Sequence, residues 1–198
     1  FAALTISKSL PKNIGTVIVK HANPCGVSIK KNHLESYISA LECDPISAFG
    51  GIVSCNYKVT KTIAEKLNKL FLEVVVANNF DIDALKILKR KRNLRLINSS
   101  NYTLKDDLKF TSNNDEILVQ SEDIKTFNIK DFKIVSKKKP NQSQMRNLIF
   151  AFNICRHVKS NAIVLAANET TAGIGSGQPS RLDSCKIAIE KMNKFQPD

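Results

Sequence analysis

Apolar runs and amphipathic segments alternate through the first half of the chain. Short apolar runs with β-branched residues in their middle predict strands, at 16–22, 50–56, 73–78 and 94–97. Apolar residues three or four positions apart predict helices around these runs, at 2–10, 33–43, 60–71 and 82–91. Strands separated by helical segments of about 10–15 residues favour an α/β fold in which helices flank a mainly parallel or mixed sheet.

The middle of the chain has a different pattern. Residues 99–140 are polar and rich in turn-forming residues, so we interpret them as a connecting excursion. Two short apolar runs within it predict strands, at 117–120 and 132–136. Asn141 and Gln144 have the spacing of a capping box, which predicts the start of a helix. The segment that follows, 145–160, is apolar on most faces and is expected to form a buried helix.

The last part of the chain returns to the alternation. Its pattern predicts a strand, a hairpin turn, a glycine-containing strand and a helix, at 162–166, 167–171, 172–177 and 180–192. The order of strand, glycine-containing turn and helix near 16–43 therefore recurs loosely near 162–192. We interpret 1–98 as a first lobe and 141–198 as the start of a second, related lobe, joined by the excursion at 99–140.

The charge of the chain is strongly basic. The 198 residues carry a formal net charge of +12, which is typical of proteins with an anionic partner. However, 24 of the 30 basic residues are lysines, whereas phosphate recognition favours the planar fork of arginine. No aromatic-interleaved basic stripe or RNA-binding signature accompanies the charge. A solvated basic surface is therefore preferred, and a basic nucleic-acid-binding module remains an alternative.

The cysteines and the hydropathy bear on the compartment. Five cysteines are widely spaced, with no C-x-x-C pair and no secretory signal, which is typical of a reduced cytoplasmic protein. No apolar run approaches the ~20 residues that cross a membrane. We expect no membrane partner.

The segment KHANPCG, residues 20–26, gathers the residues most suited to chemistry. Lys20 and His21 stand where a strand ends, and Asn23-Pro24-Cys25-Gly26 is predicted to turn the chain so that both side chains reach one site. Histidine can accept a proton near neutral pH, and lysine can stabilise a developing oxyanion. A lone polar strand end more often satisfies only local hydrogen bonds.

A zinc site of the nucleoside-deaminase type is the alternative for the same segment. That chemistry needs one His and two Cys ligands and a glutamate that shuttles protons. Here Asn23 occupies the position of the glutamate, and Cys25 has no second cysteine at the required spacing. Zinc deamination is therefore disfavoured, and we expect no metal.

Six segments carry a resemblance to a known family. They are KHANPCG (20–26), CDPISAFGGIV (43–53), FLEVVVA (71–77), ALKILKRKRNLRLI (84–97), VKSNAIVLA (158–166) and GIGSGQPSR (173–181). In this order and spacing, the chain resembles the formyltransferase domain of the bifunctional purine biosynthesis protein, which also carries IMP cyclohydrolase. The resemblance covers nearly the whole chain, and its motifs are highly specific.

The resemblance implies a fold, a reaction and partners. The fold would consist of cytidine-deaminase-like lobes. The reaction would transfer a formyl group from 10-formyltetrahydrofolate, the co-substrate, to the 5-amino group of 5-aminoimidazole-4-carboxamide ribonucleotide (AICAR), in the biosynthesis of IMP. The family acts as a cytoplasmic homodimer with shared active sites, and no nucleic acid is implied.

The resemblance also implies roles for individual residues. Those matching the family's catalytic trio are Lys20, His21 and Asn161, and those matching its substrate-binding positions are Asn23, Phe49, Gly50, Glu73 and Arg181. In these roles His21 would deprotonate the attacking amine, and Lys20 and Asn161 would stabilise the tetrahedral oxyanion. Arg181 would suit the nucleotide phosphate or the anionic folate tail.

The chain also departs from the family pattern. It lacks the cyclohydrolase domain, an upstream R-Y-G-x-N-P-H-Q segment and a C-terminal S-D-A-F-F-P-F-R-D-G region that helps to bind both substrates. The unusual residues within the matched part are Asn78, Asp115, Glu116 and Pro179. We expect the chain to be an internal fragment that is inactive alone.

Overall fold

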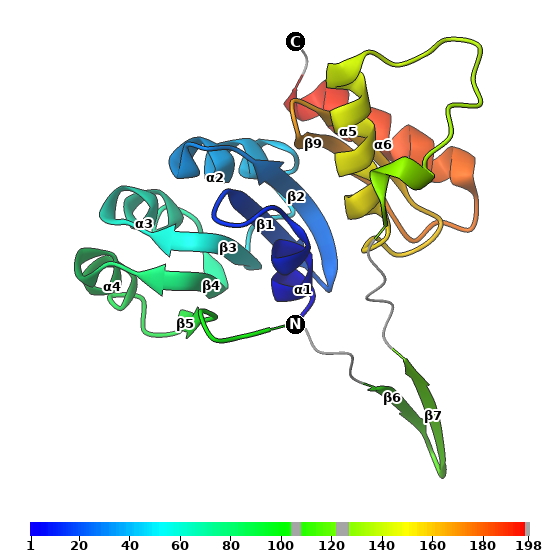
Figure 1. The fold of residues 1–198 in the computed structure, drawn as a ribbon. Helices are drawn as coiled ribbons and strands as arrows, with labels where there is room; N and C mark the ends of the chain where they lie inside the picture. Colours follow the sequence, from blue (N-terminus) through cyan, green and yellow to red (C-terminus); the bar gives the residue numbers. More distant parts are fainter. Residues whose placement is uncertain (104–107, 122–126, 197–198) are drawn as a thin grey trace. The chain divides into compact units, whose positions relative to one another are not determined.

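The computed structural model describes residues 1–103, 108–121 and 127–196. Contacts divide the chain into a larger unit, residues 1–101 with 140–198, and a smaller unit, residues 102–139. The larger unit contains one mixed sheet in the order β5-β4-β3-β1-β2-β9-β8 (Figure 1). Its strands are β1 (Gly15–Lys20), β2 (Asn23–Ile29), β3 (Gly51–Val59), β4 (Leu72–Phe80), β5 (Arg95–Asn98), β8 (Ile163–Ala167) and β9 (Thr170–Gly175).

Helices cover both faces of this sheet, which confirms the predicted α/β class (Figure 1). They are α1 (Ala2–Ser9), α2 (His33–Glu42), α3 (Lys61–Leu67), α4 (Ile82–Leu88), α5 (Gln142–Cys155) and α6 (Arg181–Phe195). Successive strand residues point to opposite faces, so Ile18 belongs to the apolar cluster that includes residues of α2, α3 and α4, whereas Val17 and Val19 belong to the cluster that includes residues of α1 and α5. The two apolar clusters enclose the sheet between helical layers.

Only part of the sheet is parallel. Strands β3, β4 and β5 are parallel, as the alternation with helices predicts. In contrast, β1 is antiparallel to β2 and β3, and β9 is antiparallel to β2 and β8. For β1–β2 and β8–β9 the reason is that each pair is a hairpin with a short turn, and a hairpin can join only antiparallel neighbours.

The first hairpin turn lies elsewhere than predicted. The predicted strand 16–22 ends at Lys20, and the predicted turn at 23–26 is instead the start of β2. The chain turns at His21 and Ala22, whose φ angles of 48° and 63° suit a two-residue hairpin loop. Pro24 lies in β2 next to a shift in the register between β1 and β2, and such an irregularity is a place where a strand tolerates proline.

Glycines allow two helices to lie directly on the strands. A Cβ on Gly26 would meet the Ala40 carbonyl of α2 at 1.8 Å, and a Cβ on Gly175 would meet the Ser184 carbonyl of α6 at 1.8 Å. Each hairpin is thus covered by the helix that follows it in the chain. The assignment of 1–98 and 141–198 to two related, cytidine-deaminase-like lobes stays a prediction.

The smaller unit contains a hairpin and a short 3₁₀ helix. Strand β7 (Glu116–Ser121) confirms the strand predicted at 117–120, and its partner β6 (Leu108–Asn113) was not predicted. The strand predicted at 132–136 is wrong, because these residues follow the 3₁₀ helix η1 (Ile129–Asp131) and pair with no other strand among the described residues. An apolar run alone does not form a strand where no neighbouring edge accepts its hydrogen bonds.

The helix after Pro140 is confirmed, but its burial is not. Both hydrogen bonds of the predicted capping box join Asn141 and Gln144 at the start of α5. Phe150 and Ile154 of α5 are buried, whereas Leu148 and Phe152 are 56% and 49% exposed. Only one face of α5 packs on the sheet of the described chain, which corrects the expectation of a buried helix.

Candidate functional site

Most of the candidate residues lie along one edge of the sheet. At this edge β1 ends and β2, β3 and β4 begin, as shown by the pairs Lys20–Asn23, Val19–Ile52 and Gly51–Leu72. The pair Ile163–Gly175 places the start of β8 and the end of β9 at the same edge, because β9 runs antiparallel to β2. Strand direction therefore brings together motifs that are far apart in the sequence.

Lys20 is fixed by the turn that precedes β3, residues 44–50, which we call the 44–50 turn. Its ammonium donates hydrogen bonds to the carbonyl oxygens of Phe49 (2.8 Å) and Gly50 (3.0 Å). Gly50 has a φ of 66°, and its N–H donates to the Phe71 carbonyl (2.8 Å). A Cβ on Gly50 would lie 2.8 Å from the Lys20 ammonium, so glycine is needed here both for the backbone and for the space.

His21 lies in the hairpin turn beside Lys20 and is exposed. Its backbone carbonyl accepts a hydrogen bond from the Asn23 side-chain amide (3.2 Å), and its left-handed φ directs the side chain out of the β1 strand. Among the described residues, no hydrogen bond joins the imidazole to Lys20 or to any other group. The imidazole is therefore open to a ligand.

Asn23 joins the hairpin to the segment that carries Asn161. Its side-chain oxygen accepts a hydrogen bond from the Lys159 N–H (3.3 Å). Asn161 in turn donates both side-chain N–H groups to the carbonyls of Gln178 (2.9 Å) and Pro179 (2.8 Å). The amide nitrogen of Asn161 is thus occupied, and its side-chain oxygen is the atom left for a ligand.

An exposed aromatic pair lies beside the Lys20 ammonium. Phe49 is 61% exposed and Phe71 is 48% exposed, and their ring centroids are 5.2 Å apart. Exposed aromatic faces of this kind are suited to stacking on a planar ligand. Sequence reasoning identified Phe49 and missed Phe71, although Phe71 begins the FLEVVVA segment that carried part of the resemblance.

Glu73 and Arg181 lie at the same edge but are not joined to this cluster. Glu73 is the exposed second residue of β4, next to Leu72, which pairs with Gly51. Arg181 is the exposed first residue of α6, directly after the N-cap Ser180. Neither side chain makes a hydrogen bond or ion pair with Lys20, His21 or Asn161 in the part of the chain that is described.

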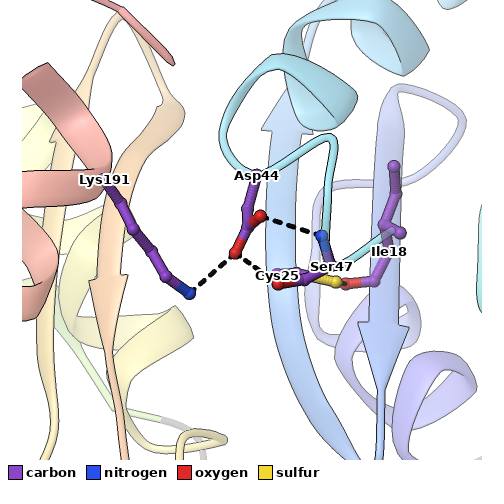
Figure 2. Close-up of polar contacts among 5 residues, drawn as sticks. All are labelled: Ile18, Cys25, Asp44, Ser47 and Lys191. Carbon is purple, nitrogen blue, oxygen red and sulfur yellow. Dashed lines mark hydrogen bonds and ion pairs between the residues drawn. The ribbon is translucent and has the colours of Figure 1, made fainter. Parts of the chain in front are cut away.

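A buried carboxylate begins the 44–50 turn, and sequence reasoning did not single it out. Asp44 is 3% exposed and accepts hydrogen bonds from the Ser47 N–H (2.9 Å), the Ser47 hydroxyl (2.7 Å) and the Lys191 ammonium (2.7 Å; Figure 2). Burial alone would raise the pKa of the Asp44 carboxyl, but the hydrogen bonds from Lys191 and Ser47 outweigh burial and leave the pKa below its ordinary value. Asp44 is therefore ionised at neutral pH.

Cys25 is a packed side chain near this carboxylate. Its thiol donates to the Ile18 carbonyl (3.5 Å; Figure 2), and burial, reinforced by the Asp44 charge, raises its pKa to about 12. A thiol in this state is a poor nucleophile and a poor metal ligand. Among residues 1–103, 108–121 and 127–196, no group of three or more His, Cys, Asp or Glu side chains could hold a metal ion, so the zinc-deaminase hypothesis has no ligand set.

The hydropathy of the helices adds one finding. None of the helices within the described ranges combines the length and the apolar character needed to span a membrane.

Comparison with known proteins decides the family. The sequence profile of the family described as AICARFT/IMPCHase bienzyme matches residues 1–191. The chain belongs to this family. Its relatives include proteins named bifunctional purine biosynthesis protein PurH, from Aquifex aeolicus (42% identical over 194 residues, 98% of this chain and 38% of the relative), Acetivibrio thermocellus (44%, 88% and 34%) and Bacillus cereus strain B4264 (44%, 95% and 37%).

The coverage limits what membership in the AICARFT/IMPCHase family establishes. The chain spans about a third of the length of these relatives and therefore matches only a part of each of them. The resemblance inferred from the sequence is confirmed at the level of the family. The roles of the individual site residues stay predictions.

Proposed function

We propose that this chain carries part of the site that transfers a formyl group from 10-formyltetrahydrofolate to the 5-amino group of AICAR in purine biosynthesis. The observation that carries the proposal is the meeting of Lys20, His21 and the Asn161 segment at one sheet edge, in a chain of the AICARFT/IMPCHase family. The names of the relatives, which describe bifunctional purine biosynthesis proteins, agree with it. The co-substrate is the folate, and the reaction needs no metal from these residues.

The chemistry requires a base and a stabiliser of negative charge. The AICAR amine is a weak nucleophile because its lone pair is delocalised into the imidazole and the carboxamide. As the amine nitrogen attacks the formyl carbon, His21 takes the amine proton and the carbonyl electrons move to the oxygen. The Lys20 ammonium, already directed by two carbonyls, stabilises the resulting oxyanion.

The second half of the reaction returns the proton. The tetrahedral intermediate collapses, the bond between the formyl carbon and N10 of the folate breaks, and His21 gives its proton to N10. The products are formylated AICAR and tetrahydrofolate. His21 is suited to both steps because its imidazole has no competing partner among the described residues.

Asn161 is given a role that differs from oxyanion stabilisation. Both of its side-chain N–H groups are taken by the Gln178 and Pro179 carbonyls. Its side-chain oxygen can instead accept an N–H of the attacking amine, which would orient the amine toward the formyl carbon. Asn161 is thus proposed to position the nucleophile while Lys20 stabilises the charge.

The remaining candidates are proposed to bind the substrates. The exposed rings of Phe49 and Phe71 suit stacking on the pterin or the imidazole, and Arg181 suits an anionic group. Asn23 holds the hairpin against the Asn161 segment, and Glu73 lies where it can accept from an amino group at the edge of the sheet. We extend to this chain the expectation of a cytoplasmic homodimer with shared active sites.

The test replaces His21 in the full-length protein that contains this chain. Asparagine is the preferred replacement because it tolerates the left-handed φ of 48° at this position and lacks the imidazole. Formyl transfer by His21→Asn should fall by about 100- to 10,000-fold in kcat. The matched control is His33→Ala. It removes a histidine away from the site that stacks on Tyr57 and is hydrogen-bonded to the Asn13 carbonyl. This variant should keep its turnover at temperatures below its unfolding. Near-normal turnover of His21→Asn would overturn the assigned role.

A further inference from the structure

The ion pair between Asp44 and Lys191 joins two parts of the larger unit (Figure 2). Asp44 follows α2, and Lys191 lies in the second half of α6. The carboxylate of Asp44 is buried and its two oxygens accept three hydrogen bonds, one from Lys191 and two from Ser47. Such a fully bonded carboxylate has one defined orientation and can hold what it contacts in place.

The first consequence concerns the 44–50 turn. The backbone carbonyl of Asp44 accepts from the Ala48 N–H (3.2 Å), and the Ser47 N–H and hydroxyl are held by the Asp44 side chain. Phe49 and Gly50, which follow Ala48 in the turn, supply the carbonyls that accept the hydrogen bonds of the Lys20 ammonium. The Asp44 carboxylate therefore fixes the conformation that presents these carbonyls to the Lys20 ammonium.

The second consequence concerns Asn161. Helix α6 carries Ser184, whose hydroxyl donates to the Asn161 backbone carbonyl (2.8 Å). Since Lys191 lies on the same helix, the ion pair fastens the helix that holds Asn161 to the turn that holds Lys20. A neutral side chain could cap the 44–50 turn equally well, so the charge is explained by the link to Lys191.

We propose that Asp44 is a positioning residue for the formyl transfer, acting through the 44–50 turn on Lys20 and through Lys191 and α6 on Asn161. Asp44 itself does not touch the substrates in this role. The proposal rests on the proposed function, because it assumes that Lys20 acts in the reaction. It adds a residue pair that the sequence analysis did not identify.

The test is a double-mutant cycle in the full-length protein. Asp44→Asn keeps an oxygen for the Ser47 N–H and removes the charge that pairs with Lys191. Its kcat for formyl transfer should fall by about 10- to 100-fold, since small misplacements of reacting groups have effects of this size. In the presence of Lys20→Ala, the same substitution should lower kcat by a clearly smaller factor than in the wild-type background, because one of the two groups that Asp44 positions is already absent and only the effect on Asn161 is left.

Matched controls separate this role from a general loss of structure. Asp83→Asn removes the carboxylate of an exposed ion pair with Lys86 and should leave kcat unchanged. If Asp44→Asn does not purify as a folded protein, Ser47→Ala takes its place, because it removes one hydrogen bond from the same carboxylate. Ser47→Ala should also lower kcat by a larger factor when Lys20 is present than when it is absent.

The outcomes are distinct. Asp44→Asn could lower kcat by the same factor in the wild-type and in the Lys20→Ala background. This result would show that Asp44 does not act through Lys20 and would overturn the proposal. The same holds for Ser47→Ala where this variant replaces Asp44→Asn. An unchanged kcat with only a lower melting temperature would also overturn it and leave a structural ion pair. A full-length wild-type protein without formyl transfer would instead refute the proposed function.

Discussion

Replacement of Gly50 by alanine should separate the backbone of the 44–50 turn from the chemistry at Lys20. Gly50 has a φ of 66°, a region in which a residue with a Cβ costs about 1–2 kcal/mol. The added Cβ would also lie 2.8 Å from the Lys20 ammonium, where contact normally requires about 3.5 Å. The ammonium must therefore withdraw by about 0.7 Å.

The fold and the activity should respond differently to this crowding. The tip of a lysine side chain moves easily, so the loss of stability should stay near the backbone cost of about 1–2 kcal/mol. The withdrawn ammonium, however, cannot keep both of its hydrogen bonds to the Phe49 and Gly50 carbonyls. We expect kcat for formyl transfer by the full-length protein to fall by about 10- to 100-fold.

A second glycine supplies the control for stability. Gly177 has a φ of 69°, but a Cβ there would meet no atom closer than the Lys159 side chain at 3.9 Å. Thermal unfolding of Gly50→Ala and Gly177→Ala should therefore show similar decreases in melting temperature. A Gly50→Ala protein that keeps its turnover within about twofold would refute the view that the ammonium position matters. A much larger loss of stability than in Gly177→Ala would show that the crowding reaches the fold.

Two further substitutions test the packing and the charge in the larger unit. Gly175→Ala should destabilise the fold by about 3 kcal/mol or more, because its Cβ would lie 1.8 Å from the Ser184 carbonyl and α6 would have to move. A melting temperature close to that of the wild type would contradict the observed position of α6. The stabilisation by the Asp44–Lys191 pair should be fully present above about pH 5 and should decrease as the pH falls through the unfolded pKa of about 3.9 and then through the lower folded pKa. The difference in melting temperature between wild type and Asp44→Asn should accordingly be smaller at pH 3 than at pH 7, and an equal or larger difference at pH 3 would refute the assigned ionisation.

The elements of the larger unit were largely predictable because their apolar periodicity agrees with their tertiary packing. Strand β4, for example, has buried residues on both faces, and its β-branched centre reads as a strand without any knowledge of its neighbours. The direction of the strands was harder to predict. Alternation with helices predicts parallel pairing and did not show that a hairpin inserts β2 as an antiparallel neighbour of β1, whereas the β8–β9 hairpin was predicted from the turn at 167–171.

The site shows where local sequence rules give the wrong answer. The composition of Asn23-Pro24-Cys25-Gly26 predicts a turn, yet the chain turns at His21 and Ala22, which are not typical turn residues. Local preference is overruled because Gly26 is needed under the Ala40 carbonyl of α2, which fixes β2 in the sheet. As a result, His21 lies in the loop and is exposed rather than in the strand, as its proposed role requires.

The pair of Asp44 and Lys191 shows a second kind of contact that the sequence did not predict. Capping of a turn by aspartate can be read from the Asp-Pro-x-Ser spacing, but nothing in the sequence shows that a lysine of the last helix pairs with the same carboxylate. Motif resemblance identified residues proposed to touch the substrates, and these can be matched one at a time. Residues that act by holding others become visible only when the contacts are known. If the double-mutant cycle shows coupling between Asp44 and Lys20, the site must be regarded as extending from the sheet edge into the interface between α6 and the 44–50 turn.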